Sequence, residues 1–193
     1  MQGRRFFSSL LKSTMRNFSI QPGGSMPFYL AGKAMSPNLN LPVLNKYTQE
    51  EFCKVPLADE SHVEQATAIA SEIGAAKMKA LPPYVRQQIL LNVVKEATER
   101  RDEFAYYLAI EAGKPIADAR GEADRLIQTF QLSAEEATRI YGEYADLQIA
   151  GRAKGYSSVT KRVPIGPVSL ISPFNLYVQT KTRIIVFILN QKP

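Results

Sequence analysis

Apolar side chains recur every three or four positions over most of residues 61–141, which predicts a layer of amphipathic helices. The first helix is expected to begin at Ser61, because Ser61 and Glu64 have the spacing of a capping box. A second helix is expected from Pro82-Pro83, since the missing N–H of proline costs nothing in the first helical turn.

A stop signal separates the third helix from the fourth. Arg100–Asp102 marks a break after the second helix, and Gly113 fits the left-handed position just past the end of the third. Pro115 prevents that helix from continuing, so a long fourth helix is predicted over residues 116–141. The motif around Lys114 is thereby explained as a helix end, and we interpret Lys114 as a structural residue.

The apolar stripes predict which side chains of these helices face the protein core. The inward set is Val63, Ala66, Ala70, Ile73, Val85, Ile89, Leu90, Val93, Val94, Ala97, Phe104, Tyr107, Leu108, Ala112, Ala119, Ala123, Leu126, Ile127, Phe130, Ala134 and Ala137. Polar residues between them are expected to face water: Arg86, Gln87, Lys95 and Glu99 on the second helix, and Asp118, Glu122, Arg125 and Arg139 in exposed pairs on the fourth.

Segments with strand character lie on both sides of the helices. Residues 28–33 and 41–47 are typical of two short strands with a turn between them, and residues 147–163 alternate around a polar turn as a β-hairpin does. Val168–Ile171 is a short apolar run without alternation, bounded by Gly-Pro and Ser-Pro. Such a run is typical of a strand buried on both faces of a parallel sheet.

The net charge of +6 is unevenly distributed along the chain. Residues 1–49 contain six basic and no acidic residues, residues 50–146 contain 11 basic and 18 acidic residues, and residues 147–193 contain seven basic and no acidic residues. The last seven are spread along strand-like segments without a stacking array of aromatic rings, so we expect no nucleic-acid partner. The apolar run Ile184–Leu189 is too short to span a bilayer, so we expect no membrane partner.

The counts of cysteine and histidine exclude several kinds of site. Cys53 is the only cysteine, so neither an internal disulfide nor a cluster of thiolate ligands can form within the chain. We interpret Cys53 as a small, half-buried hydrophobic residue. His62 is the only histidine and stands where the first helix opens, so no metal site is expected.

The chain begins with a segment rich in Arg and Ser and free of acidic residues, in which Phe6, Phe7, Leu10, Leu11 and Phe18 have near-helical spacing. This composition is typical of a transit peptide, which predicts a mitochondrial matrix location. The alternative is a disordered basic arm without targeting function, and a cytoplasmic protein.

The residues that could carry chemistry follow the predicted buried strand. Ligands bind at the carboxyl ends of strands in parallel sheets, which is where Ser172-Pro173-Phe174-Asn175 is expected. The Asn175 amide could donate to a negative charge developing on a substrate oxygen, an oxyanion role worth about 3 kcal/mol of barrier. The alternative is that Asn175 binds only the backbone of its own turn.

The same stretch resembles a known family. Arg162-Val-Pro-Ile-Gly-Pro-Val168 and Ile171-Ser-Pro-Phe-Asn175 are similar to the strand that enters the cofactor site in the aldehyde dehydrogenase superfamily. Upstream, Glu111-Ala-Gly-Lys-Pro115, Ala119-Arg120, Glu122, Arg125 and Thr129-Phe130 resemble the first helical layer of that superfamily, in the same order. The resemblance covers about residues 28–175.

The resemblance implies an α/β fold: the N-terminal part of an aldehyde dehydrogenase-like fold, with a helical layer, a protruding β-hairpin and the first strand of a nucleotide-binding parallel sheet. It implies that Asn175 stabilises the oxyanion of a thiohemiacetal, and that Ile171, Ser172, Pro173 and Phe174 lie near the nicotinamide of NAD or NADP. The family reaction oxidises an aldehyde to a carboxylic acid. The hairpin at 147–163 would cross to a neighbouring subunit of a homo- or hetero-oligomer.

The resemblance also implies a partial enzyme, because a whole enzyme of this superfamily is more than twice as long. We expect a transit peptide at 1–25, part of a dehydrogenase domain at 26–175 and a divergent tail at 176–193. The family's nucleophilic cysteine and general-base glutamate find no match, so we expect the chain to be inactive alone. The alternative is a non-catalytic partner of a full-length homologous subunit. The sequence favours neither NAD nor NADP, nor a particular aldehyde.

The transit-peptide interpretation predicts that residues 1–30 fused to a fluorescent reporter will carry it into mitochondria, because a basic, acid-free amphipathic segment is what mitochondrial import recognises. Microscopy of transfected cells checks this. A reporter that stays entirely in the cytosol would contradict it.

Overall fold

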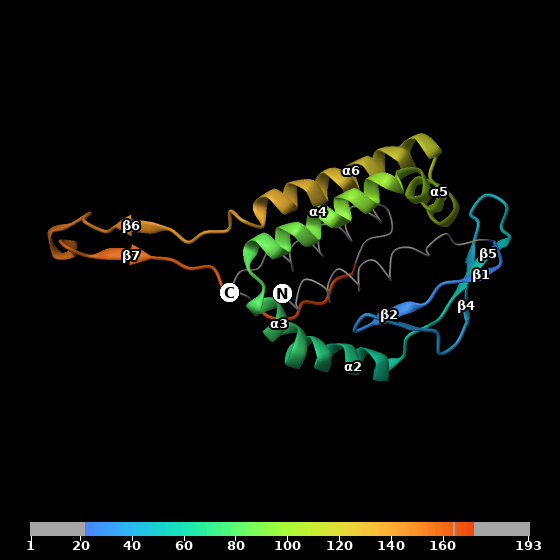
Figure 1. Cartoon of the computed structure of the whole chain (residues 1–193), viewed down its shortest axis with the longest axis horizontal. Helices are drawn as coiled ribbons and strands as arrows, with labels where there is room; N and C mark the ends of the chain where they lie inside the picture. Colours follow the sequence, from blue (N-terminus) through green and yellow to red (C-terminus); the bar gives the residue numbers. More distant parts are fainter. Residues whose placement is uncertain (1–21, 164, 172–193) are drawn as a thin grey trace.

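The computed structural model describes residues 22–163 and 165–171. Three helices form its main layer, namely α4 (Pro83–Glu99), α5 (Arg101–Ala112) and α6 (Ile116–Glu136). Helices α4 and α6 run antiparallel side by side, and α5 crosses at one end of the pair (Figure 1). The predicted helical layer is therefore confirmed.

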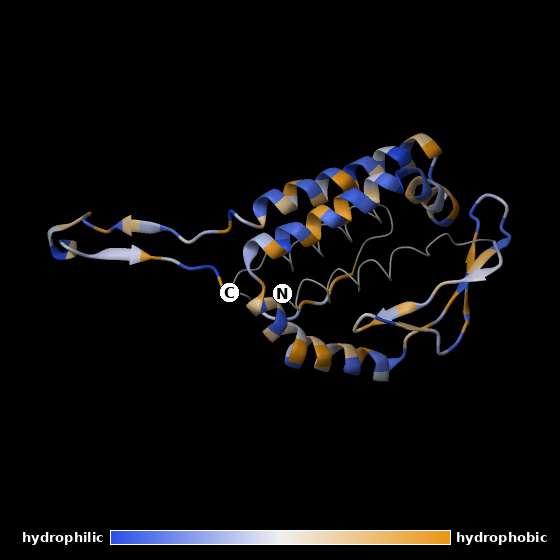
Figure 2. Cartoon of the chain, in the orientation of Figure 1, coloured by the Kyte–Doolittle hydropathy of each residue, from blue (hydrophilic) through white to orange (hydrophobic). Residues whose placement is uncertain are grey.

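The apolar stripes of α4 and α6 form the largest buried cluster of the described residues. Leu90, Ala97, Leu126, Phe130, Ala134 and Ala137 are its buried members. Three of the six are alanines, and these small side chains let the two helix backbones approach closely. Figure 2 shows apolar turns of both helices interleaved with polar ones, as in amphipathic helices packed along one face.

The predicted helix boundaries are confirmed at three places. Pro83 is the first residue of α4, Arg100 separates α4 from α5, and Gly113 ends α5 with a left-handed φ of 67°. A Cβ on Gly113 would lie 3.1 Å from Cβ of Lys46, so space as well as φ favours glycine. The fourth helix was predicted too long: α6 ends at Glu136, and the chain leaves through turn hydrogen bonds instead of continuing to residue 141.

Two charged residues predicted to face water are fully buried, so those predictions were wrong. Arg86 lies one turn before Leu90 on the inward stripe of α4, and burial lowers the pKa of its guanidinium. Glu122 lies between Ala119 and Leu126 on the inward stripe of α6 and forms an ion pair with Lys114. Both side chains have the helical spacing of the inward stripe, but they were assigned to the surface because a buried charge has to find a partner.

The strands form three small sheets. β1 (Gly24–Ser25), β5 (Glu51–Val55) and β4 (Leu41–Leu44) form a three-stranded sheet in the order β1-β5-β4. β2 (Phe28–Leu30) and β3 (Lys33–Met35) form a separate antiparallel hairpin. The sequence prediction had a turn joining 28–33 to 41–47 and had no strand at β5. That strand was missed because Glu51 and Lys54 flank only two apolar residues, too few for a periodic signal.

The first helix is α2 (Glu60–Ile69), which continues through the π-helical turn η1 (Ala70–Gly74) into α3 (Ala75–Ala80). None of its residues is buried, and Val63 and Ile73 are 60% and 47% exposed. The predicted inward face of this helix is therefore not covered by the part of the chain that the structure describes.

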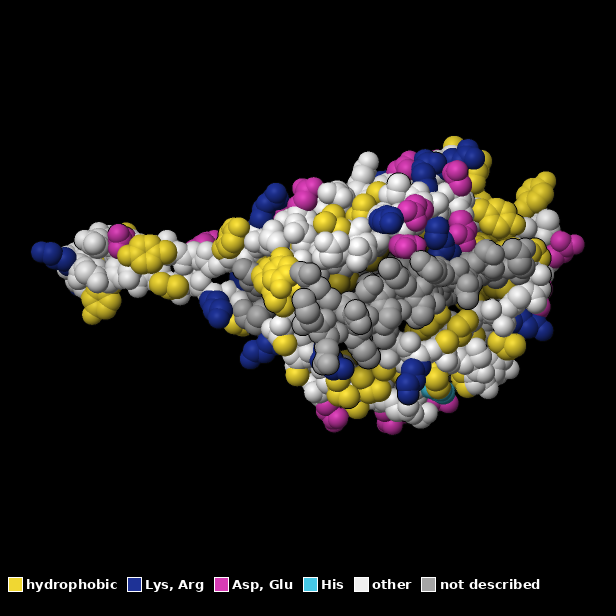
Figure 3. Space-filling view, in the orientation of Figure 1, with side chains coloured by type: hydrophobic (Ala, Val, Ile, Leu, Met, Phe, Trp, Pro, Cys, Tyr) yellow, Lys and Arg dark blue, Asp and Glu magenta, His cyan; other side chains and the backbone are white. Residues whose placement is uncertain are grey.

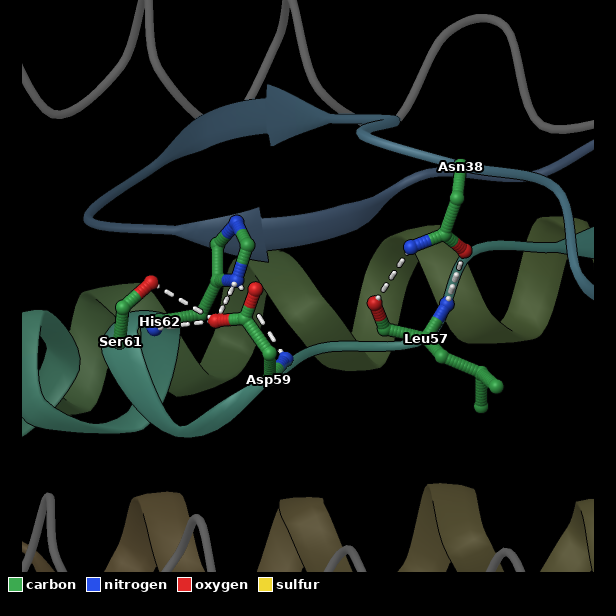
Figure 4. A network of polar contacts seen from close by, with 5 residues as sticks. All are labelled: Asn38, Leu57, Asp59, Ser61 and His62. Atoms are coloured by element: carbon green, nitrogen blue, oxygen red, sulfur yellow. Dashed lines mark hydrogen bonds and ion pairs between the residues drawn. The ribbon is translucent and has the colours of Figure 1, made fainter.

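The N-cap of α2 is Asp59, so the predicted capping box of Ser61 with Glu64 was wrong. Figure 4 shows the Asp59 carboxylate among three groups. It accepts from the His62 N–H at 3.1 Å and from the Ser61 hydroxyl at 2.7 Å, and the His62 Nδ1 lies 2.6 Å from the same oxygen. The hydrogen bond from Ser61, followed by those from His62, lowers the pKa of Asp59 to about 2.

Two further contacts lie near the start of α2. The Asn38 side chain donates to the Leu57 carbonyl at 3.0 Å and accepts from the Leu57 N–H at 2.8 Å (Figure 4). The His62 ring meets the Phe28 ring edge-on, with 5.2 Å between their centroids. The Asn38 bonds thus join the β3–β4 connection to the β5–α2 connection, and the ring contact joins the first turn of α2 to β2.

An arm of two strands, β6 (Tyr144–Asp146) and β7 (Ser157–Val159), projects away from the helical layer (Figure 1). The two strands are antiparallel and flank a turn that contains the short 3-10 helix Gly151–Ala153. A hairpin is present as predicted, but its first strand lies before the predicted bounds of 147–163. No helix among the described residues is both long and apolar enough to cross a membrane.

The Lys114–Glu122 pair predicts a large stabilising effect for one lysine. Lys114→Ala would leave the Glu122 carboxylate buried without this cation, and we expect the free energy of unfolding to fall by about 3 kcal/mol. Urea unfolding followed by circular dichroism measures this.

The matched control is Lys95→Ala, because Lys95 and Glu99 form an exposed pair. We expect a change of at most about 0.5 kcal/mol for that variant. Equal effects of the two substitutions would contradict a structural role for the buried pair.

Candidate functional site

The segment expected to carry the chemistry leaves the arm and returns towards the helical layer (Figure 1). Residues 165–171 form no strand, Val168 is half-buried, and Ile171 is 92% exposed. The predicted buried strand at Val168–Ile171 is therefore wrong for this structure. A strand buried on both faces needs a neighbouring strand and covering helices, and none of the three described sheets includes these residues.

Four of the five predicted site residues, Ser172, Pro173, Phe174 and Asn175, lie outside the described residues. The fifth, Ile171, stands at the end of the described segment with its side chain exposed. The roles predicted for Asn175 and for the backbone beside the nicotinamide therefore stay predictions.

Cys53 is a core residue and not a nucleophile. It is 3% exposed and packs with Phe52 and Ile110 between the β4–β5 strands and α5. Burial raises the pKa of its thiol, and the negative charges of Glu111 and Glu51 raise it further. A thiol in such surroundings is held in the neutral form, which is the less reactive one.

Two arginines at the break between α4 and α5 each form a two-point ion pair with a carboxylate. Arg100 donates through Nε and Nη2 to both oxygens of Glu103, at 2.6 Å each. Arg101 donates to both oxygens of Asp124 on α6, at 2.5 and 2.6 Å. These forks lower the pKa of Glu103 and of Asp124.

The Arg101–Asp124 fork joins α5 to α6, whereas the Arg100–Glu103 fork lies within the first turn of α5. Each carboxylate is bound by its own arginine, so the two do not form a catalytic pair. Sequence reasoning identified the break at Arg100–Asp102 but not the partner of Arg101. Asp124 lies 23 residues further along the chain, and no local pattern links the two.

His62 is fully engaged in the cap of α2, as described above, and confirms the expectation that it stands at a helix opening. Within the described ranges, no group of three or more His, Cys, Asp or Glu side chains is arranged to hold a metal ion.

Comparison with known proteins decides the family. The model of the family described as "Aldehyde dehydrogenase family" matches residues 34–189. This chain belongs to that family. The match includes the α4–α6 layer, the arm and the segment through Asn175, and it extends into residues 176–189, where the sequence suggested divergence.

Similar enzymes are found among curated proteins. The 3-sulfolactaldehyde dehydrogenase of Priestia megaterium is 36% identical over 148 residues, which are 77% of this chain and 30% of that enzyme. The lactaldehyde dehydrogenase of Methanocaldococcus jannaschii is 36% identical over 136 residues, which are 70% of this chain and 28% of that enzyme. This aldehyde dehydrogenase chain thus spans about a third of the length of its relatives.

Solved structures show the same fold. Aldehyde dehydrogenase 21 from Physcomitrella patens, in complex with its product succinate, superposes with a TM-score of 0.82 at 39% identity, over 89% of this chain and 36% of that one. Glyceraldehyde-3-phosphate dehydrogenase GapN from Methanocaldococcus jannaschii, complexed with NADP, gives 0.71 at 31% identity, over 80% and 32%. The predicted α/β fold class, as part of a larger domain, is confirmed.

The burial of Cys53 predicts slow reaction with a thiol reagent. We expect Ellman's reagent at neutral pH to modify the native chain much more slowly than the urea-unfolded chain, because the folded thiol is both inaccessible and kept protonated. Absorbance at the reagent's product band follows the reaction. Equally fast modification in both states would contradict the core assignment of Cys53.

Proposed function

We propose that this chain is the N-terminal part of an NAD(P)-dependent aldehyde dehydrogenase that oxidises a small aldehyde to a carboxylic acid. The observation that carries the proposal is the family match over residues 34–189, which runs through the Ile171–Asn175 motif. The relatives named above are themselves called aldehyde dehydrogenases, and one solved relative holds NADP.

In this proposal Asn175 donates its amide N–H to the substrate oxygen as that oxygen becomes negative. Ile171, Ser172, Pro173 and Phe174 form part of the wall beside the nicotinamide. The nicotinamide cofactor, when bound, accepts the hydride of the aldehyde carbon. These assignments rest on the position of each residue in the family motif.

A complete reaction also needs a thiolate to attack the aldehyde and a base to activate water for release of the acid. Cys53 cannot supply the thiolate, because it lies in the core with a raised thiol pKa. We therefore expect this chain alone to be inactive.

Two further proposals concern location and assembly. The N-terminal segment would direct the protein to the mitochondrial matrix, with the cytoplasm as the alternative. The arm would bind another subunit, either a second copy or a homologous full-length chain. The proposed assembly is supported by the exposed apolar side chains of the arm, because a two-stranded ribbon is only marginally stable by itself in water.

The second candidate function follows from the arm alone. A chain that lacks the nucleophile but keeps the arm could join the assembly of a complete homologous enzyme without taking part in the chemistry. Copurification with such an enzyme would favour this function.

A chimeric enzyme tests the oxyanion role. Residues 34–189 replace the matching segment of the Priestia 3-sulfolactaldehyde dehydrogenase, and the formation of NADH or NADPH is followed with its aldehyde. We expect an active chimera whose kcat falls about 100- to 1,000-fold on Asn175→Ala, since that substitution removes one oxyanion donor.

The matched control is Asn92→Ala, because Asn92 is an exposed amide on α4. That variant should keep the activity of the parent chimera. A folded chimera without activity would contradict the family function, whereas an active chimera insensitive to Asn175→Ala would contradict only the oxyanion role.

A further inference from the structure

Helix α2 and its continuation through η1 and α3 have apolar side chains on an uncovered surface. None of the residues in these three helical segments is buried, and Val63 and Ile73 are 60% and 47% exposed. Helices α4 and α6, by contrast, bury their apolar stripes against each other. Since most helical stability in proteins comes from packing an apolar face, a segment bound over Val63 and Ile73 would stabilise α2.

The same surface is acidic. Residues 59–74 contain Asp59, Glu60, Glu64 and Glu72 and no lysine or arginine, and all four carboxylates are exposed. Glu60 and Glu64 are four residues apart, a spacing at which like charges destabilise a helix. Among the ion pairs of the described residues, none includes Glu60, Glu64 or Glu72. Figure 3 shows hydrophobic and acidic side chains along α2, at the lower edge of the view. We refer to residues 59–74 as the α2 face.

The chain itself contains a segment of complementary composition. Residues 1–21 lie outside the described residues, and they contain Arg4, Arg5, Lys12 and Arg16 and no acidic residue. Their apolar side chains have near-helical spacing. The basic charge matters for the choice of partner, because any apolar partner could cover Val63 and Ile73, but only a cationic one also neutralises the carboxylates of the α2 face.

The described start of the chain holds the end of this segment near α2. The Gly23 N–H donates to the Phe52 carbonyl at 2.8 Å, and the Phe28 ring lies 5.2 Å from the ring of His62 in the first turn of α2. The five residues from Gly23 to Phe28 span at most about 18 Å. A segment of 21 residues spans about 30 Å as a helix and more when extended, so it is long enough to lie along the α2 face.

We propose that residues 1–21 bind the α2 face of the same chain: their basic side chains pair with its carboxylates, and their apolar side chains cover Val63 and Ile73. The covalent link favours this partner over a separate molecule, because a short linker gives an effective concentration of about 1 mM or more. A surface with weak affinity is therefore occupied from within the chain first. The segment acts as a removable cover of α2, and its binding does not depend on the proposed enzymatic activity or location.

A spin label on the segment tests this binding in the full chain. Ser9→Cys carries a nitroxide, and the parent chain serves as the blank because Cys53 is only 3% exposed. Nuclear magnetic resonance then measures the broadening of backbone amide signals. We expect strong broadening of the signals of the α2 face and little broadening in α4. Because exposed charges are screened by salt, raising the ionic strength from about 0.01 M to about 0.5 M should reduce the broadening of the α2 face.

Charge reversal identifies the contacts. We expect Glu64→Lys combined with Glu72→Lys to lower the bound fraction of the segment by about ten-fold, and Arg4→Glu combined with Arg5→Glu to do the same. All four substitutions together should restore the broadening, and a variant that merely unfolds α2 could not be rescued in this way. The matched control is Glu99→Lys, because Glu99 is an exposed carboxylate on α4, and it should leave the broadening unchanged.

A mixture of two samples separates binding within the chain from binding between chains. Spin-labelled chain without isotope is added to isotope-labelled chain without the spin label, so that only contacts between molecules broaden the signals. We expect no broadening in this mixture. Broadening of the α2 face that appears in the mixture as strongly as in the single sample would overturn the proposal in favour of a second copy.

Three other results would also overturn the proposal. These are absence of broadening in the spin-labelled chain, broadening that is as strong in α4 as in the α2 face, and broadening that the charge reversals leave unchanged.

Discussion

The antiparallel contact between α4 and α6 is the constraint on which the other described elements depend. Leu90 and Phe130 fill the seam, and Ala97 and Ala134 let the two backbones come close. Helix α5 is attached to this pair at one end, and the Lys46 N–H donates to the carbonyl of Ile110 at the end of α5, which connects the β4–β5 turn to the layer. The arm begins where α6 ends.

Charged side chains form two kinds of ion pair around the α4–α6 contact. At the α4–α5 break, arginine forks bind carboxylates at the edge of the layer, where solvent reduces the desolvation cost. Inside, Glu122 is removed from water completely and depends on Lys114, which the chain presents directly after the glycine that ends α5. The end of α5 and the buried ion pair are therefore linked, because Gly113 turns the chain so that the next residue, Lys114, reaches Glu122 on α6.

The sequence predicted well those features that local chemistry decides. Proline at the start of α4, glycine after α5 and the alternation in the arm each act within a few residues, and the structure has all three. A competing local signal caused one error, because Asp59, not Ser61, caps α2.

Two other kinds of error concern the surroundings of a segment rather than its own pattern. Arg86 and Glu122 follow the inward stripe despite their charge, and the cation for Glu122 comes from another segment. Val168–Ile171 has the composition of a buried strand, but a strand forms only where a neighbouring strand offers hydrogen bonds. The role of Asn175 stays a prediction that rests on the family resemblance, because that residue lies outside the described residues.

Central to this account is the claim that the helical layer forms from this chain alone, whereas the strand leading to the site requires sheet neighbours that the described residues do not supply. Native-state hydrogen exchange of the 193-residue chain, read by mass spectrometry, tests it most directly. The account predicts strong protection of amides in α4 and α6 and nearly unprotected exchange in residues 168–171. Protection of 168–171 equal to that of α6 would contradict it.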